Sequence, residues 1–272
     1  MTPEGEPGVS DFGISSGELP GRRAAGRAAD RAADRAADSD SDSDSAGAGS
    51  DDPRFALATE VRRIISAMVG LPLEDDELEA ATGVISALAD RLEGAAGAGR
   101  RPRAQPDPVG AAQDFFPTSP VIGYANPLAP PVVVEAVNGE LHGTALFDYQ
   151  YEGPPTCVHG GVIAMVFDEM LGAANILSGN PGMTGTLTIR YRKPTPLLTP
   201  LRLEAKFVRR EGRKIYTTGT IHHGDVLTAE AEGIFIELVP TEFMKIVSEN
   251  SDSPEAIEQV RADARRLGLT GT

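Results

Sequence analysis

Cysteine, basic side chains and long apolar runs are all scarce in this chain of 272 residues. The single cysteine, Cys157, excludes an intrachain disulfide, and we therefore expect a reducing compartment, the cytoplasm. The 40 acidic residues outnumber the 25 basic ones and give a net charge of −15. With this balance and no basic stripe, nucleic acid is not expected as a partner. A few local arginines would still suffice for a phosphate-bearing small molecule.

The apolar runs are too short for a secreted or membrane-spanning protein. No apolar segment follows the amino terminus, so we expect no signal peptide. The longest apolar stretch, 162–177, is interrupted by Asp168 and Glu169 and is shorter than the roughly 20 residues of a spanning helix, so no membrane span is expected. No Gly-x-Ser-x-Gly sequence lies at a strand-to-helix turn, as the elbow of serine hydrolases does, because the one match, at 13–17, falls in the low-complexity amino-terminal segment. The P-loop is missing, so the sequence argues against both classes.

The first half of the chain divides by composition into three segments. Residues 1–50 hold few large apolar side chains, an Arg-Ala-Ala-Asp repeat and a Ser-Asp tract, so we expect a disordered acidic low-complexity tail. A helix over the repeat is the alternative, although a polar helix without a packing partner is marginal in water. Apolar residues at three- and four-residue spacing predict a helical hairpin over 51–93, whose apolar face should dock on the rest of the chain or on a partner. The Gly-, Ala-, Arg- and Pro-rich residues 94–113 indicate a linker.

The second half has the pattern of an antiparallel sheet with one helix. Two strand-like runs flank Asn138-Gly139, a strong hairpin signal, and a long helical pattern follows over about 160–178. The expected strands are 132–137, 141–147, 184–192, 201–209, 213–222 and 226–238. The helix is apolar around most of its circumference, so other structure should enclose it. This pattern predicts an α+β hotdog fold over 114–245, an antiparallel sheet wrapped around a long central helix, followed by a carboxy-terminal helix within 246–272.

Two carboxylates and a pair of glycines stand out around the central helix. Asp168 and Glu169 lie in its middle, where a buried charge is costly unless it has a partner or a function. Adjacent helical residues point about 100° apart, so at most one of the two should face a given pocket, and pairing with an arginine is the alternative. His159, Gly160 and Gly161 precede the helix, where backbone N–H groups suit an oxyanion. A plain helix-entry turn would also explain the glycines.

Four short motifs lie at characteristic separations in this half of the chain. They are Glu-Gly-Pro-Pro at 152–155 with Val-His-Gly-Gly at 158–161, Asp168 nine residues after the histidine, Tyr-Arg-Lys-Pro-Thr-Pro-Leu at 191–197, and Glu-Gly-Arg-Lys at 211–214. The set resembles the PaaI-like hotdog-fold acyl-CoA thioesterases, most of all the branch of thioesterase superfamily member 4. The similarity spans about 151–240 and does not reach residues 1–100. It implies a hydrolase of acyl-CoA in lipid metabolism, for which we expect no cofactor and no metal.

The resemblance also implies roles for individual residues. Asp168 falls on the family's catalytic carboxylate, which acts as general base for water or as the nucleophile itself. Gly160 supplies an oxyanion N–H, His159 orients the loop and the thioester carbonyl, and Thr184 positions water. Residues that fall where the family contacts the CoA substrate are Gly161, Arg190, Arg192, Arg213 and Lys214. Because one protomer gives the aspartate and its neighbour the glycine loop, the resemblance implies a homodimer at least, or a tetramer made by pairing dimers.

Other assignments stay open on the residues alone. Some relatives place an asparagine shortly before the histidine, whereas 152–156 contains none, which leaves a second carbonyl contact open. Cys157 lies two residues before His159, so a Cys-His nucleophile pair is conceivable, although free cysteines are usually small buried hydrophobes. His222 and His223 point to opposite faces of a strand, which disfavours a shared metal. A non-catalytic acyl-CoA-binding hotdog protein is the main alternative function, and enoyl-CoA hydration would need an Asp and His signature that is missing.

Overall fold

The computed structural model describes residues 53–96 and 117–239, together with single positions between 245 and 262. The expected acidic tail, most of the expected linker and most of the expected carboxy-terminal helix lie outside the described residues. The single positions that are described near the carboxyl end, 245, 249, 258, 261 and 262, are helical.

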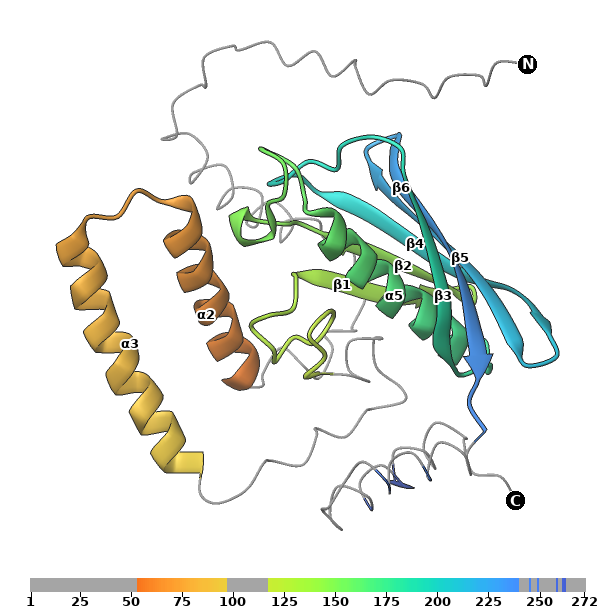
Figure 1. Cartoon of the computed structure of the whole chain (residues 1–272), viewed down its shortest axis with the longest axis horizontal. Helices are drawn as coiled ribbons and strands as arrows, with labels where there is room; N and C mark the ends of the chain where they lie inside the picture. Colours follow the sequence, from red (N-terminus) through yellow and green to blue (C-terminus); the bar gives the residue numbers. More distant parts are fainter. Residues whose placement is uncertain are drawn as a thin grey trace, which may run out of the picture. The chain divides into compact units, whose positions relative to one another are not determined.

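Six strands form one antiparallel sheet (Figure 1). They are β1 (Val132–Val137), β2 (Glu140–Ala145), β3 (Gly182–Tyr191), β4 (Leu201–Glu211), β5 (Lys214–His223) and β6 (Val226–Glu237). Across the sheet the order is β1-β2-β4-β5-β6-β3, and every neighbouring pair is antiparallel. Each of the six predicted strands is present within a few residues of its expected bounds. The strand β3, which follows the central helix, therefore lies at an edge of the sheet.

The first hairpin forms at the predicted turn. Asn138 and Gly139 have φ angles of 53° and 82°, and the strands on either side pair from Val137 with Glu140 onward. Two consecutive positive φ angles are typical of the type I′ turn, which follows the right-handed twist of the strands and favours Asn-Gly. The local sequence thus sets the register in which β1 and β2 enter the sheet.

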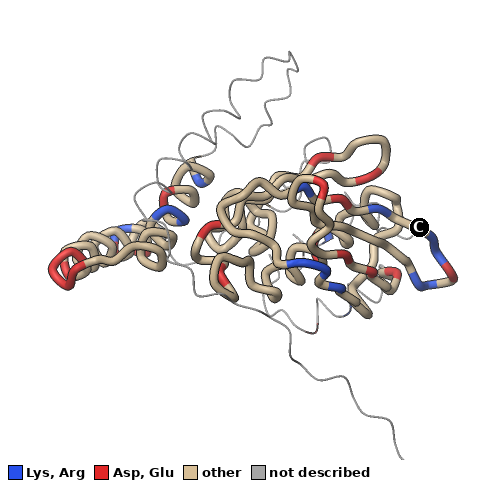
Figure 2. The backbone as a smooth tube through the Cα atoms, turned by 90° about the horizontal axis from the view of Figure 1, so that it is seen from above, with Lys and Arg blue, Asp and Glu red and all other residues tan. Residues whose placement is uncertain are grey.

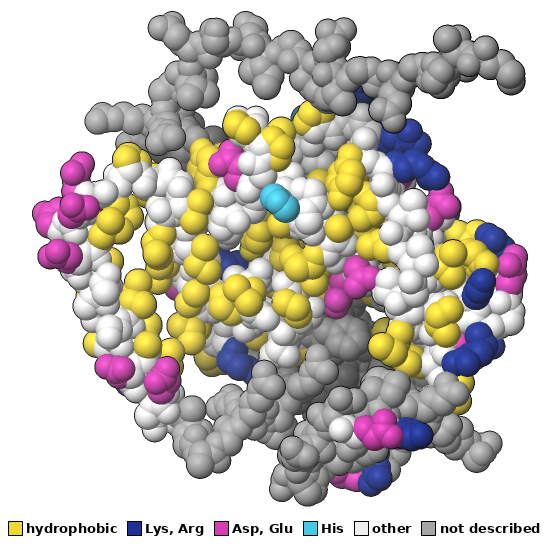
Figure 3. Space-filling view, in the orientation of Figure 1, with side chains coloured by type: hydrophobic (Ala, Val, Ile, Leu, Met, Phe, Trp, Pro, Cys, Tyr) yellow, Lys and Arg dark blue, Asp and Glu magenta, His cyan; other side chains and the backbone are white. Residues whose placement is uncertain are grey.

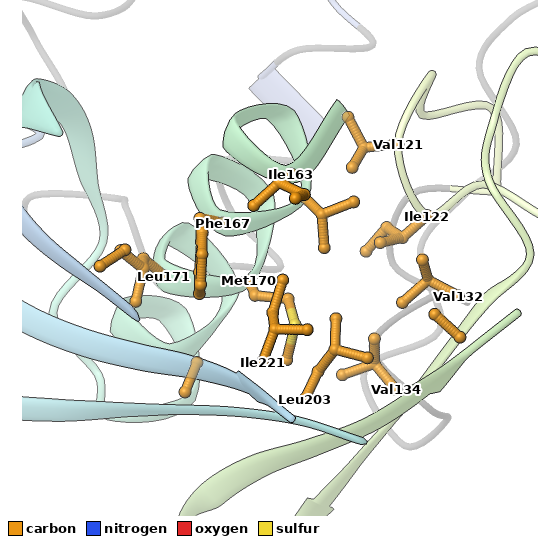
Figure 4. Close-up of a cluster of buried hydrophobic side chains, with 14 of the residues drawn as sticks. Val121, Ile122, Val132, Val134, Ile163, Phe167, Met170, Leu171, Leu203 and Ile221 are labelled. Atoms are coloured by element: carbon orange, nitrogen blue, oxygen red, sulfur yellow. The ribbon is translucent and has the colours of Figure 1, made fainter. Parts of the chain in front are cut away.

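The central helix α5 (Gly160–Leu177) packs one face against the sheet (Figure 4). Its buried residues recur at three- and four-residue spacing: Ile163, Val166, Phe167, Met170, Leu171, Ala174 and Asn175. They meet a core from the inward-facing residues of the strands, such as Val134, Leu203 and Ile221. This is the predicted α+β hotdog architecture. The expected enclosure on all sides is not reached within one chain, because the sheet covers only one face of the helix.

The 18 residues of α5 are also the one stretch of the described chain long and apolar enough to cross a membrane. Length and composition alone give this result, and the core helix of a globular domain passes the same test. Six buried apolar residues account for its apolar character, and the seventh buried residue is Asn175.

The helix α2 (Pro53–Gly70) docks on the segment 117–131, called here the strap, and on the short helix η2 (Tyr149–Tyr151). The guanidinium of Arg62 donates to three strap carbonyls, those of Tyr124 at 2.9 Å, Ala129 at 3.1 Å and Asn126 at 3.2 Å. Burial lowers the pKa of Arg62. The strap in turn packs Val121 and Ile122 into the core beside α5 (Figure 4).

The helix α3 (Asp75–Ala96) has three acidic residues in its first turn, which complement the positive end of its dipole. Every one of its side chains whose exposure is described is exposed, except the half-buried Leu88. The hairpin predicted for 51–93 is therefore present as two helices, of which only α2 is anchored to the sheet domain.

Candidate active site

The loop before α5 is held by backbone contacts to the segment that follows β3. The Val158 N–H donates to the Thr195 carbonyl at 2.8 Å, and Cys157 forms an isolated antiparallel bridge with Pro196. Thr156 has a φ of 67°, a conformation that a β-branched residue rarely adopts. Strain of this kind persists only where surrounding contacts fix the chain, so the loop delivers the next residues to the helix in one conformation.

His159 is the N-cap of α5. Its Nδ1 accepts a hydrogen bond from the Gly161 N–H at 2.9 Å, and its own N–H donates to the Tyr151 carbonyl at 2.8 Å. A ring nitrogen that accepts carries no proton, so in neutral His159 the proton sits on Nε2. The exposed Nε2–H is thus a donor suited to a carbonyl oxygen. A side chain at Gly153 would collide with the His159 backbone, because an added Cβ there would lie 2.7 Å from its Cα.

Gly160 opens the helix with its N–H unengaged. No hydrogen bond to this N–H is found within the described part of the chain, whereas the Gly160 carbonyl accepts from the Tyr191 hydroxyl at 2.8 Å. A first-turn N–H without an acceptor, at the positive end of the dipole, favours a negatively charged oxygen. Tyr191 is the first residue of the motif at 191–197, but its contact with Gly160 was not predicted from the sequence. This contact could have been predicted from the alternation along β3, which places Tyr191 on the inward face of the strand with Leu187 and Ile189.

Asp168 lies one residue before Glu169, but the two carboxylates have different surroundings. Asp168 is exposed and its Oδ1 accepts from the Thr184 hydroxyl at 2.7 Å. Glu169 is half-buried, and its Oε1 accepts from the strap hydroxyl of Ser119 at 3.1 Å. The geometry therefore leaves Asp168 open to a ligand and ties Glu169 to the strap. Nothing in the sequence indicated Ser119, since 50 residues separate it from its partner.

A β-bulge brings Thr184 to Asp168. The pairing of β3 with β6 shifts between Thr184 and Thr186, so Gly185 is the extra residue. The bulge changes which side of the sheet the next side chains face, and Thr184 consequently points to the helix side together with Leu187. Bulges of this kind are common beside functional sites because they re-aim one side chain.

Within one chain, Asp168 and Gly160 do not meet. They are eight residues apart on α5, and a rise of 1.5 Å per residue separates them by about 12 Å along the helix axis. A single thioester carbonyl is much smaller than that distance. The expected oxyanion donor and the expected carboxylate can therefore share one carbonyl only if they come from different copies of the chain.

The four expected CoA-binding side chains fall into two pairs at opposite ends of the sheet. Arg190 donates to Glu232 at 2.6 Å, and Arg192 to Glu230 at 2.5 Å. The pKa of Arg190 is raised, mainly by its hydrogen bond to Glu232. Arg213 and Lys214 lie at the other end, because Lys214 pairs with Ile236 whereas Arg190 pairs with Glu230, and six residues of β6 span roughly 20 Å. One chain does not bring all four together.

The alternative Cys-His pair is disfavoured by hydrogen bonding. The Nδ1 of His159 is already engaged by the Gly161 N–H, so only Nε2 could take a proton from Cys157. In the neutral tautomer described above, Nε2 is protonated. Among the described residues no group of three or more His, Cys, Asp or Glu side chains could hold a metal ion.

The sheet packed on one long helix, with a glycine turn at the start of that helix and an open carboxylate in its middle, defines a hotdog domain of the thioesterase type. The family model described as the thioesterase superfamily matches residues 156–230. A crystal structure described as a thioesterase superfamily protein is 34% identical, covers 69% of this chain and 92% of its own, and has a TM-score of 0.63. The chain belongs to the thioesterase superfamily. The family expected from the motifs is thereby confirmed.

Curated relatives carry a more specific name. The chain is 38% identical over 91 residues to acyl-coenzyme A thioesterase THEM4 of Xenopus laevis, which covers 33% of this chain and 41% of that protein. It is 40% identical over 91 residues to acyl-coenzyme A thioesterase THEM4 of Mus musculus, with 33% and 39% covered. The match thus spans about two-fifths of the length of these relatives.

Proposed function

We propose that this protein hydrolyses acyl-CoA thioesters to a free acid and CoA. The observation that carries the proposal is the placement of Asp168 in the middle of α5, open to solvent and bonded to Thr184 at 2.7 Å. A carboxylate held by one hydroxyl and free on its other side can accept a proton from water or attack a carbonyl carbon. The acyl-CoA part of the proposal is supported by the names of the curated relatives.

The reaction follows from the chemistry of a thioester. As a general base, Asp168 takes a proton from a water that Thr184 helps to position, and the water oxygen bonds to the carbonyl carbon. The carbonyl oxygen becomes an oxyanion, which the Gly160 N–H and the His159 Nε2–H stabilise. The C–S bond then breaks, and the CoA thiolate leaves and takes up the proton. As a nucleophile, Asp168 would instead form an acyl anhydride that water hydrolyses to the same products.

The complete site in this proposal combines two copies of the chain, with Asp168 from one and the Gly160 turn from the other. The separation of about 12 Å along α5 is the support from geometry. A second support is the position of Thr184 on β3, an edge strand whose outer hydrogen-bonding groups are open to another chain. A homodimer is then the minimum active unit.

The same pairing bears on CoA. Within one chain, the pair Arg190 and Arg192 is separated from the pair Arg213 and Lys214. In a dimer, one pair from each copy can contact the CoA phosphates at the same site. Arg190 and Arg192 would have to exchange a glutamate for a phosphate. Arg213, in the exposed turn between β4 and β5, and Lys214, at the exposed start of β5, are proposed as further contacts to the CoA phosphates.

Release of free thiol from a panel of acyl-CoA thioesters tests the proposal. The wild type should turn over at least one chain length, and Asp168→Asn should lower kcat by roughly 10²–10⁴-fold, as the loss of a general base does. Glu169→Gln is the matched control, because its carboxylate is tied to Ser119, and it should cost less than about tenfold on that scale. Binding of acyl-CoA without thiol release would favour a non-catalytic binding protein.

A further inference from the structure

Both amino-terminal helices carry an apolar stripe that the rest of the described chain leaves uncovered. The stripe on α2 and the turn after it consists of Leu57, Val61, Ile64, Met68 and Leu71. The stripe on α3 consists of Leu78, Ala81, Ile85, Leu88 and Leu92. The large exposed side chains of these two stripes show between 38% and 58% of their surface. Figure 3 shows hydrophobic side chains along both helices, with open space between them.

The spacing within the stripes is that of a helix–helix seam. In both, successive apolar residues alternate between steps of three and four, an average of 3.5 residues. This is the repeat of helices that pack side by side along their length, and it gives a narrower stripe than a helix lying on a sheet. The pattern favours other helices as the partner.

The stripe on α2 is separate from the face that anchors this helix. Ala58, Arg62 and Ser66 hold α2 to the strap and η2, Ala58 by burial, Arg62 through carbonyls and Ser66 through a hydrogen bond to Asp148. They lie about 100–180° around the helix from Leu57, whereas the other stripe residues lie within about 40° of it. The anchoring of α2 therefore leaves its stripe available.

The two stripes do not cover each other within one chain. Among the described elements, α2 packs mainly against η2. No described helix or strand packs against α3 to a similar extent. In proteins most of the stability of a helix comes from the packing of its apolar face, and the described elements do not pack against that face of α3. We therefore expect another apolar helical surface to pack between α2 and α3.

The charges of the two helices favour a second copy of this chain as the occupant. The helix α2 has three arginines and one glutamate, whereas α3 has six acidic residues and one arginine (Figure 2). A second hairpin placed antiparallel by a two-fold axis sets the acidic α3 of each copy against the basic α2 of the other. Attraction and apolar burial then act together in the same interface.

We propose that the α2–α3 hairpin is a self-association surface, through which two copies form an antiparallel four-helix bundle. Each α3 stripe packs against the α2 stripe of the other copy, as in bundles whose helices are joined by short loops. This surface is distinct from the β3 edge, and it does not depend on the proposed hydrolase activity. If both surfaces are used, the hairpins join two dimers into an assembly of four chains.

Sedimentation velocity on the full chain tests this surface. Ile85→Asp combined with Leu92→Asp should halve the apparent mass relative to the wild type, because two carboxylates enter the seam. Ala87→Asp combined with Ala80→Asp adds the same charge at exposed sites on the far side of α3, about 140–200° from Ile85, and should leave the mass unchanged. The melting temperature of the sheet domain verifies that each variant is folded.

Hydrogen exchange of α3 supplies a second readout. Its amides should exchange at least tenfold more slowly in the wild type than in the seam variant, because packing protects an otherwise marginal helix. An apparent mass that is the same for the wild type and the folded seam variant would overturn the proposal. So would exchange of α3 in the wild type that is already as fast as in the variant. Thiol release from acyl-CoA, measured on the same samples, reports separately on the hydrolase.

Discussion

At the scale of single residues, the unengaged N–H of Gly160 is the proposed oxyanion donor. Gly160 is the first residue of α5, and the preceding His159 has φ −60° and ψ 133°. This is the extended conformation that proline prefers in the residue before it, and the first helical position is where proline is best tolerated. The N–H can therefore be deleted with little change to the helix.

Gly160→Pro should lower kcat by roughly 10²–10³-fold, as removal of one oxyanion donor does. Gly160→Ala keeps the N–H, and its added Cβ would lie 3.4 Å from the Tyr191 hydroxyl, an ordinary contact, so turnover should stay near that of the wild type. Steady-state thiol release measures both. Equal losses of kcat in the two variants would mean that the site requires the absence of a side chain at Gly160, and not its N–H.

The turn residue Arg213 should affect binding more than chemistry. A phosphate contact is the same in the ground state and the transition state, so Arg213→Ala should raise KM by about tenfold and change kcat little. Arg202→Ala removes an arginine that bonds to Glu204 on another part of the sheet, and it serves as the control. Kinetics at several acyl-CoA concentrations separate the two parameters. A large fall in kcat at constant KM would place Arg213 among the reacting groups.

Sequence alone identified only some of these residues. Asp168, His159 and Gly160 were predicted from motifs and Thr184 from the family resemblance, and in the structure Thr184 bonds to Asp168 and His159 caps the glycine turn. Two contacts were not predicted, that of Tyr191 with Gly160 and that of Ser119 with Glu169. Each joins residues at least 31 positions apart, so only the sheet order and the strap bring the pairs together.

At the scale of elements, the strap links the amino-terminal hairpin to the central helix. Its carbonyls bind Arg62 of α2, its Ser119 bonds to Glu169 of α5, and its Val121 and Ile122 lie in the core. The Tyr151 hydroxyl donates to the Ala129 carbonyl at 3.0 Å, and burial raises the pKa of this phenol. The anchoring of α2 is thus continuous with the packing of α5.

Arg62→Ala should destabilise the protein by roughly 2–4 kcal/mol, because it removes charged hydrogen bonds and takes one donor away from each of three strap carbonyls. Arg63→Ala, which removes an exposed pair with Glu60 on the same helix, should cost less than about 1 kcal/mol. Denaturant unfolding of the two variants gives the comparison. Equal small losses would show that α2 is only loosely attached to the strap.

Elements were more predictable than their surroundings. Alternation located all six strands, and Asn138-Gly139 located the first hairpin, because both signals are local. An apolar helix face, in contrast, does not reveal what covers it. The sequence suggested that α5 is enclosed, yet one chain buries only one face, and the stripes of α2 and α3 stay exposed. The missing surface belongs to other copies in the assembly proposed here.

At the scale of the whole molecule, one active site in the proposed mechanism combines two copies of the chain. A chain presents its Asp168 and its Gly160 about 12 Å apart along α5, so in this proposal the two residues of one chain would serve different sites. A pair related by a two-fold axis would hold two equivalent sites, each built from both chains. Suppose that one chain carries a substitution at Asp168 and its partner carries a substitution at Gly160. Both substitutions would then lie in the same site, and the other site of the pair would be intact.

Complementation between two inactive variants tests this directly. Asp168→Asn and Gly160→Pro chains, each nearly inactive alone, are co-expressed, and the unseparated mixture of assemblies is assayed for thiol release. Random pairing should restore about a quarter of the wild-type turnover per chain, because half of the pairs are mixed and each mixed pair has one intact site. Activity of the mixture no higher than that of the separate variants would contradict an active site shared between two copies of the chain.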